Sequence, residues 1–161
     1  MNDFGVIYDL NRKLDQKFIK KYAKNEPLYF EKNCIEFLIE LGELVNETKC
    51  FKYWTVKKPN KELVLEEYAD CIIMIFPFFG MLDVNLDNLG EHQESDNILV
   101  VINYLYHQGT KLMTELSEAL VKDIFVNLLY LGDLLELSKE EIIEATIKKQ
   151  NKVEQRLNDE Y

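Results

Sequence analysis

Apolar residues return every three or four positions from Phe4 to about Ala23, at Val6, Ile7, Leu10, Leu14, Phe18 and Tyr22. This spacing places them on one face of a helix. After Pro27, a broad apolar stripe with the same spacing follows from about Leu28 to Glu47. The 161 residues include only six glycines and three prolines, too few to supply the turns of a many-stranded sandwich or barrel. The sequence therefore predicts an all-α fold.

Turn and capping residues divide the rest of the chain. Asn60 is expected to cap a third helix through Phe76, where the ring of Pro77 must bend or end it. The stretch from Gly80 to Asp96 is expected to be irregular.

The C-terminal half shows three further signals. Asp96 is expected to cap a fourth helix that Gly109 breaks, and residues 111–136 are expected to form one or two more helices. Ser138 and Glu141 form a capping box, which predicts a last helix from near Lys139 to about Leu157. No repeat or linker divides the chain. We expect one domain over residues 1–161, with five or six helices around a four-helix-bundle-like core.

Charge and cysteine content exclude several classes of protein. The formal net charge of −10, from 19 Lys and Arg against 29 Asp and Glu, disfavours binding to nucleic acid or to anionic membranes. Three cysteines without a C-x-x-C pair suggest neither a disulfide framework nor a zinc site, and favour a reducing cytoplasm. The longest uncharged apolar run, from Cys71 to Leu82, is too short to cross a membrane. No signal peptide is visible at the N-terminus.

Acidic residues form one line on the second predicted helix. Spacings of four, three and four place them within a wedge of about 60°; they are Glu36, Glu40, Glu43 and Glu47. Like charges at such spacings destabilise a helix, so we expect a metal ion or a lysine to face this line.

The third predicted helix repeats the pattern at Glu67 and Asp70, directly before the apolar run that begins at Cys71. A carboxylate in dry surroundings must pair with a base, be protonated or bind a metal. Since a short connection makes the two helices antiparallel neighbours, Glu40 and Glu43 are expected to lie near Glu67 and Asp70. Four oxygen ligands without His or Cys suit Mg²⁺, which also binds waters and substrate phosphates.

Basic and aromatic residues lie in the connection between these two helices and in the last helix. The connection carries five lysines, at positions 49, 52, 57, 58 and 61, together with Phe51, Tyr53 and Trp54. The last helix carries Lys148, Lys149, Lys152 and Arg156. Lysine and arginine charges suit phosphate and an aromatic ring suits stacking, although cations near the end of a helix also favourably oppose its dipole.

Three motifs resemble the dimeric, all-α dUTPase family, which is related to MazG-like pyrophosphatases. They are Glu40-Leu-Gly-Glu43, its continuation through Asn46-Glu47-Thr-Lys-Cys-Phe-Lys52-Tyr-Trp54, and Glu67-Tyr-Ala-Asp70. The family pattern of E-x-x-E followed by E-x-x-D is kept, with 23 residues between Glu43 and Glu67. Weaker matches are Asn11 to Asp15, and a C-terminal set of Lys149, Arg156 and Tyr161.

The resemblance implies a homodimeric enzyme that hydrolyses dUTP to dUMP, with dUDP as an open second substrate. It implies Mg²⁺ ligands at Glu40, Glu43, Glu67 and Asp70, with Glu40 and Glu43 as the catalytic pair and Glu43 as the general base. Deoxyuridine nucleotide contacts would come from Asn11, Asn46, Lys52, Trp54, Lys149 and Arg156.

The sequence departs from the family pattern at Asn11, where the family usually has Gln. Val153 and Leu157 replace the expected Asn and Gln of the tail, and Ile73 replaces a frequent His. Two alternatives therefore remain open. One is a related all-α pyrophosphatase acting on dCTP or non-standard nucleotides, as in MazG-like housecleaning enzymes. The other is a non-catalytic helical interaction protein.

Overall fold

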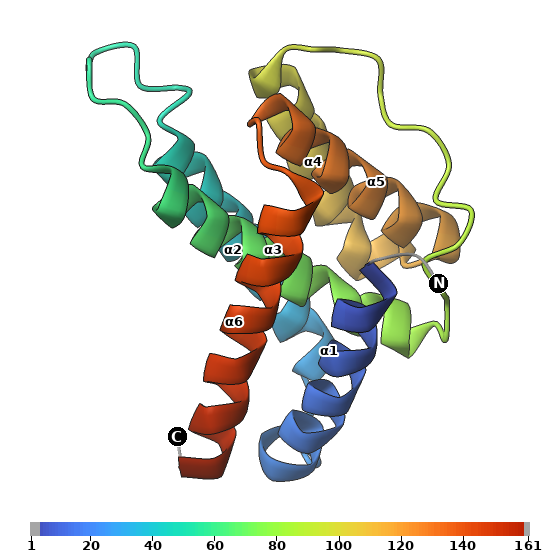
Figure 1. The fold of residues 1–161 in the computed structure, drawn as a ribbon. Helices are drawn as coiled ribbons and strands as arrows, with labels where there is room; N and C mark the ends of the chain where they lie inside the picture. Colours follow the sequence, from blue (N-terminus) through green and yellow to red (C-terminus); the bar gives the residue numbers. More distant parts are fainter. Residues whose placement is uncertain (1–3, 160–161) are drawn as a thin grey trace.

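The computed structural model describes residues 4–159, and this part of the chain is helical, without strands (Figure 1). Its elements are α1 (Phe4–Phe18), the π-helical turn η1 (Ile19–Ala23), α2 (Tyr29–Thr48), α3 (Lys61–Met81), α4 (Ile98–Glu115), α5 (Glu118–Leu134) and α6 (Lys139–Asp159). The predicted all-α class is confirmed, and η1 completes the helix expected to end near Ala23.

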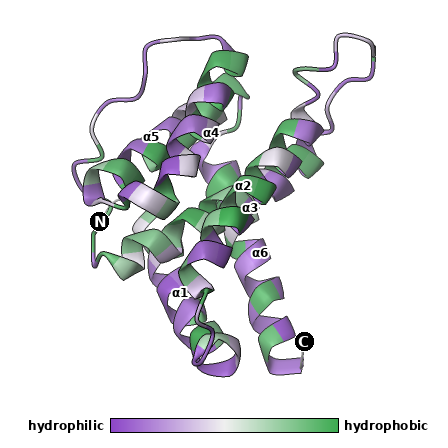
Figure 2. Ribbon diagram, turned by 180° about the vertical axis from the view of Figure 1, so that it is seen from behind, coloured by the Kyte–Doolittle hydropathy of each residue, from purple (hydrophilic) through white to green (hydrophobic). Residues whose placement is uncertain are grey.

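Helix α3 lies at the centre of the bundle. It packs against α1, α2, α5 and α6, while α4 packs against α2 and α5. Tyr68 on α3 is fully buried and donates a hydrogen bond of 2.6 Å to the carbonyl of Leu128 on α5. Figure 2 shows the apolar residues gathered where α2 and α3 cross the middle of the molecule, whereas α1 and α6 present many polar residues. Helices α1 and α6 therefore form a more polar layer over the apolar centre.

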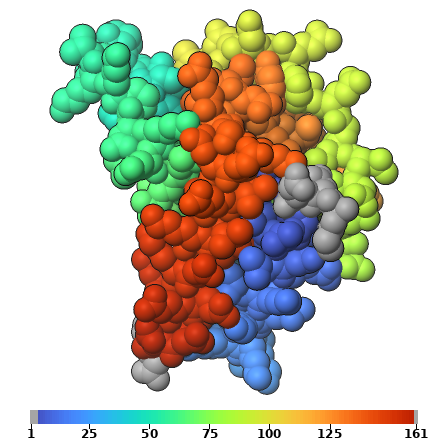
Figure 3. Space-filling model, in the orientation of Figure 1, coloured from blue at the N-terminus to red at the C-terminus, as the bar shows by residue number. Residues whose placement is uncertain are grey.

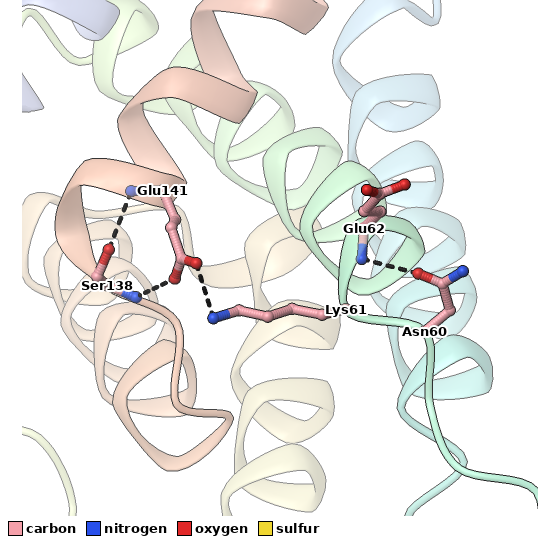
Figure 4. A network of polar contacts seen from close by, with 5 residues as sticks. All are labelled: Asn60, Lys61, Glu62, Ser138 and Glu141. Atoms are coloured by element: carbon pink, nitrogen blue, oxygen red, sulfur yellow. Dashed lines mark hydrogen bonds and ion pairs between the residues drawn. The ribbon is translucent and has the colours of Figure 1, made fainter.

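The predicted caps of α3 and α6 are confirmed, and a salt bridge joins them (Figure 4). The Asn60 side chain accepts a hydrogen bond of 2.9 Å from the backbone N–H of Glu62. At α6, the Glu141 N–H donates to Ser138 Oγ at 3.1 Å, and the Ser138 N–H donates to the Glu141 carboxylate at 2.8 Å. Lys61 Nζ lies 2.7 Å from the same carboxylate. The starts of α3 and α6 are thereby held together.

Helix α3 continues through Pro77 to Met81, so of the two outcomes expected at Pro77, a bend or an end, the proline does not end the helix. Proline cannot donate a hydrogen bond to the carbonyl four residues earlier, which here belongs to Ile73. That carbonyl instead accepts a hydrogen bond of 3.4 Å from the side-chain amide of Asn11 on α1. A contact from another helix thus replaces the bond that the proline removes.

The expected boundaries of α4 need two corrections. Its N-cap is Asn97, not Asp96, because the Asn97 side chain accepts a hydrogen bond of 3.0 Å from the Leu99 N–H. Gly109 does not break α4. It lies inside the helix, where a Cβ would stand only 2.9 Å from the Leu38 side chain, so it permits α4 to approach α2 closely.

Of the one or two helices expected over residues 111–136, only α5 lies between α4 and α6. Residues 111–115 complete α4, and Ser117 caps α5 by accepting a hydrogen bond from the Leu120 N–H.

The irregular segment between α3 and α4 is fixed at several points. The Tyr8 hydroxyl donates to the Val84 carbonyl at 3.0 Å, and the Gln93 N–H donates to Asn127 Oδ1 at 3.0 Å. The His92 ring stacks on Tyr130 with the ring centroids 3.7 Å apart. In the described residues, no helix combines the length and apolar character that crossing a bilayer requires.

Candidate active site

Helices α1, α2, α3 and α6 and the turn η1 enclose a pocket of about 540 Å³. Carboxylates line one part of it: Asp15, Glu26, Glu36, Glu40, Glu43, Glu67 and Asp70. Apolar and aromatic side chains line another part, including Leu14, Phe18, Tyr22, Tyr29, Ile73 and Met74. The pocket therefore offers both a charged region and a surface that could hold a ring.

Three acids converge at the crossing of α2 and α3. Glu40, Glu67 and Asp70 each offer a carboxylate oxygen, and these oxygens lie within 4.8 Å of one another. The helical spacing explains this, because the acids flank residues such as Leu41 and Tyr68 that are fully buried between the helices. Glu43, the fourth expected ligand, lines the same pocket but is exposed and stands outside this group of three.

The three carboxyl groups of this cluster are harder to ionise than free ones, because each has a raised pKa. Burial, followed by the charges of Asp70, Glu43 and other acids, raises the pKa of Glu40 to about 7. Burial and the neighbouring carboxylates also raise the pKa of Glu67 and of Asp70. A cation among these oxygens would restore the ionised forms. An all-oxygen donor set suits a hard divalent cation, so the residues fit the metal that the resemblance implies.

Lys149 on α6 already approaches this cluster. Its ammonium group lies 2.5 Å from Asp70 and 3.6 Å from Glu66. Burial acts to lower the pKa of Lys149, but the hydrogen bond and charge of Asp70 outweigh it, so the net shift is upward. Lys149 is thus a positively charged group at the edge of the acids, as expected for a phosphate contact.

Asn11 lines the pocket but is only 1% exposed, and its amide is fully engaged. Its Nδ2 donates to Asp15 at 3.2 Å and to the Ile73 carbonyl at 3.4 Å. Its Oδ1 accepts from Gln150 Nε2 at 3.3 Å. Burial raises the pKa of the Asp15 carboxyl to about 7, against the opposing effect of the hydrogen bond from Asn11.

The remaining expected substrate contacts divide into two groups. Arg156 lines the pocket, whereas Asn46, Lys52 and Trp54 are not among its lining residues. Lys52 Nζ donates to Asn46 Oδ1 at 2.7 Å, and Trp54 is 64% exposed. Asn46 lies in the last turns of α2, and the segment between α2 and α3 that carries Lys52 and Trp54 stands at the upper left of Figure 3, apart from α1. Tyr161, the last residue of the weaker C-terminal match, lies outside the described residues.

Sequence reasoning assigned no site role to several lining residues: Asp15, Tyr29, Asn33, Glu36 and Gln150. Glu36 could have been found, because it belongs to the acidic line of the second helix. Burial and then the charge of Asp70 raise its pKa, which marks it as part of the same electrostatic cluster. No local pattern could place Gln150, whose partners lie about 140 positions earlier.

The fold and the pocket define an all-α protein with a carboxylate cluster suited to a divalent cation and a phosphorylated ligand. A model of the dUTPase family matches residues 3–161. The chain belongs to this all-α dUTPase family and is an enzyme of the type that hydrolyses dUTP to dUMP and pyrophosphate. Comparison with curated proteins gives no match. Membership of an enzyme family disfavours the alternative of a non-catalytic interaction protein.

Proposed function

We propose that the protein is a Mg²⁺-dependent dUTP diphosphatase that uses the pocket between α1, α2, α3 and α6. The observation that carries this proposal is the convergence of Glu40, Glu67 and Asp70 within 4.8 Å. The acidic cluster lies in a cavity of about 540 Å³, which is within the usual size of small-ligand sites.

Glu40, Glu67 and Asp70 would hold the metal, with Glu43 at the edge of the cluster. When bound, Mg²⁺ supplies positive charge against the triphosphate and makes a water molecule more acidic. Glu43 is exposed beside these acids and can take the proton of the attacking water. Glu40, with its pKa raised to about 7, is the second member of the catalytic pair and is ionised once a cation offsets its neighbours.

Cationic side chains on α6 would bind the phosphates. Lys149 lies beside Asp70, and Arg156 lines the same pocket two turns further along the helix. Both can donate charge-assisted hydrogen bonds to phosphate oxygens. Asn46, Lys52 and Trp54 remain proposed contacts, which require the end of α2 and the segment that follows it, or those of a second copy, to reach the nucleotide.

Activity measurements on a set of nucleotides decide between the proposed function and its alternatives. Pyrophosphate release is measured for dUTP, dCTP, dTTP and UTP, and phosphate release for dUDP, with Mg²⁺ and with a chelator. We expect Mg²⁺-dependent turnover with dUTP preferred. Preferred turnover of dCTP, or comparable turnover of ribonucleotides, would instead favour the related pyrophosphatases.

Asp70→Asn should lower kcat/KM for dUTP by about 100-fold or more, because a half-buried ligand oxygen loses its charge. Asp133→Asn is the matched control, since Asp133 is exposed on α5 and does not line the pocket. Equal activity of the two variants would contradict the proposed site.

We also propose a homodimer made of single-domain protomers in the cytoplasm. Ile35 and Ile39 on α2 are 50% and 53% exposed, which leaves apolar surface beside the acidic line for a second copy. The free thiols of Cys34, Cys50 and Cys71 suit a reducing compartment. Sedimentation equilibrium tests the dimer, and a monomer at micromolar concentration would contradict it.

A further inference from the structure

Gln150 carries a buried acceptor that has no partner. The residue is 2% exposed and lines the pocket, and its Oε1 makes no hydrogen bond in the structure. A buried carbonyl oxygen without a donor has lost its hydrogen bonds to water and gained none in return. Such an atom in a ligand pocket indicates that a donor arrives with the ligand.

The surrounding contacts fix which end of the Gln150 amide is free. Its Nε2 donates to the Ile7 carbonyl at 2.7 Å and to Asn11 Oδ1 at 3.3 Å. Asn11 must in turn keep its Nδ2 toward two acceptors, Asp15 and the Ile73 carbonyl. Reversing either amide would place oxygen against oxygen. The free group of Gln150 is therefore an acceptor.

Asn11 cannot take this role without breaking its own contacts. Its amide bridges α1 to the Ile73 carbonyl released by Pro77 and also holds Asp15 and Gln150. Asn11 is thus a positioning residue for Gln150. Lys149 and Gln150 are consecutive residues of α6 with different partners. Lys149 pairs with the Asp70 carboxylate, whereas Gln150 donates a hydrogen bond to the Ile7 carbonyl of α1.

We propose that Gln150 Oε1 accepts the N3–H of the uracil base and thereby determines the preference for uracil over cytosine. This inference rests on the proposed dUTP hydrolysis. Uracil carries a hydrogen on N3, whereas neutral cytosine presents a lone pair there, which would face the Gln150 oxygen unfavourably. Thymine also carries an N3–H, so Gln150 does not discriminate dUTP from dTTP.

The test combines a change in the substrate with a change in the protein. The substrate change is N3-methyl-dUTP, in which a methyl group replaces the N3 hydrogen and both carbonyls are kept. We expect the wild-type enzyme to use this analogue with a kcat/KM about 10- to 100-fold below that for dUTP, because the buried acceptor stays unpaired. In Gln150→Met the acceptor is gone, so kcat/KM for dUTP falls and the ratio between the two substrates approaches one.

Gln155→Met is the matched control, since Gln155 is exposed on the same helix and does not line the pocket. It should keep the wild-type ratio. Equal wild-type use of both substrates, or an unchanged ratio in Gln150→Met, would overturn the inference. The wild-type comparison needs no substitution, so it decides even if Gln150→Met does not fold. Absence of any dUTP turnover by the wild type would overturn the proposed function itself, and is seen before the analogue is used.

Discussion

The ammonium group of Lys149 lies 2.5 Å from a carboxylate oxygen of Asp70. This ion pair joins α6 to the acidic cluster of α2 and α3. Under the proposed function, a metal ligand, Asp70, and a phosphate contact, Lys149, therefore lie side by side in the pocket. Lys149 partly neutralises the acids, so we expect it to compete with the proposed divalent cation for Asp70.

Lys149→Met should separate metal binding from catalysis. Removal of the competing charge should strengthen Mg²⁺ binding without nucleotide several-fold. Loss of a phosphate contact should lower kcat for dUTP by about 100-fold. Titration calorimetry and pyrophosphate release measure the two effects. Lys148→Met is the control, because Lys148 is exposed on the same helix and does not line the pocket. Parallel loss of metal affinity and activity would contradict the competition.

Magnesium affinity should rise with pH, because Glu40 must lose its proton to bind metal. With the pKa of Glu40 at about 7, we expect about a tenfold increase in affinity between pH 6 and pH 8. Titration calorimetry in both buffers measures it. In Glu40→Gln, Mg²⁺ affinity should depend less on pH. The same pH dependence in the variant would show that Glu40 is not the group whose proton is lost on metal binding.

The free energy of unfolding of the metal-free protein should fall as pH rises, opposite to the trend in Mg²⁺ affinity. The folded protein keeps the Glu40 proton up to about pH 7, whereas an ordinary glutamate loses it near 4.5. The unfolded chain therefore binds fewer protons in this window, so the free energy of unfolding falls as pH rises from about 4.5 to 7. Chemical denaturation across this range measures the slope, which should be smaller in Glu40→Gln.

Asn11→Leu should destabilise the protein by about 1–3 kcal/mol, because it leaves the Ile73 carbonyl and the Gln150 amide without their partner. Pro77→Ala restores a backbone N–H for that carbonyl. The cost of Asn11→Leu should therefore be smaller in the Pro77→Ala background. Urea denaturation of the four proteins gives the coupling energy. A cost independent of the background would show that the two sites act separately.

Trp54 is the only tryptophan, so its fluorescence reports on one position. With 64% of the residue exposed, its emission should be that of a solvated indole. If Trp54 contacts the nucleotide as proposed, adding dUMP or a non-hydrolysable dUTP analogue with Mg²⁺ should quench or blue-shift the emission. Unchanged emission under saturating nucleotide would exclude Trp54 from the binding site.

The sequence predicted the helical class and most of the acidic cluster, since both depend on local spacing. Glu40, Glu67 and Asp70 could be paired because periodicity fixes the face of each helix and the short connection fixes the neighbours. Local rules also gave the caps at Asn60 and Ser138.

Features that depend on distant contacts could not be predicted. Pro77 stays inside α3 because Asn11 satisfies the freed carbonyl, and no sequence rule shows that contact. Gly109 lies inside α4 at a point where the Leu38 side chain leaves no room for a larger residue, and that close approach cannot be seen in the local sequence. The buried acceptor of Gln150 likewise arises from partners on α1.

Binding of Mn²⁺ in place of Mg²⁺, followed by electron paramagnetic resonance, tests the central claim most directly. With a non-hydrolysable dUTP analogue, the wild-type protein should immobilise the ion, while Glu67→Gln and Asp70→Asn should bind it far more weakly and Asp133→Asn should match the wild type. Equal Mn²⁺ binding by the wild type and the two cluster variants would contradict a metal site at Glu40, Glu67 and Asp70.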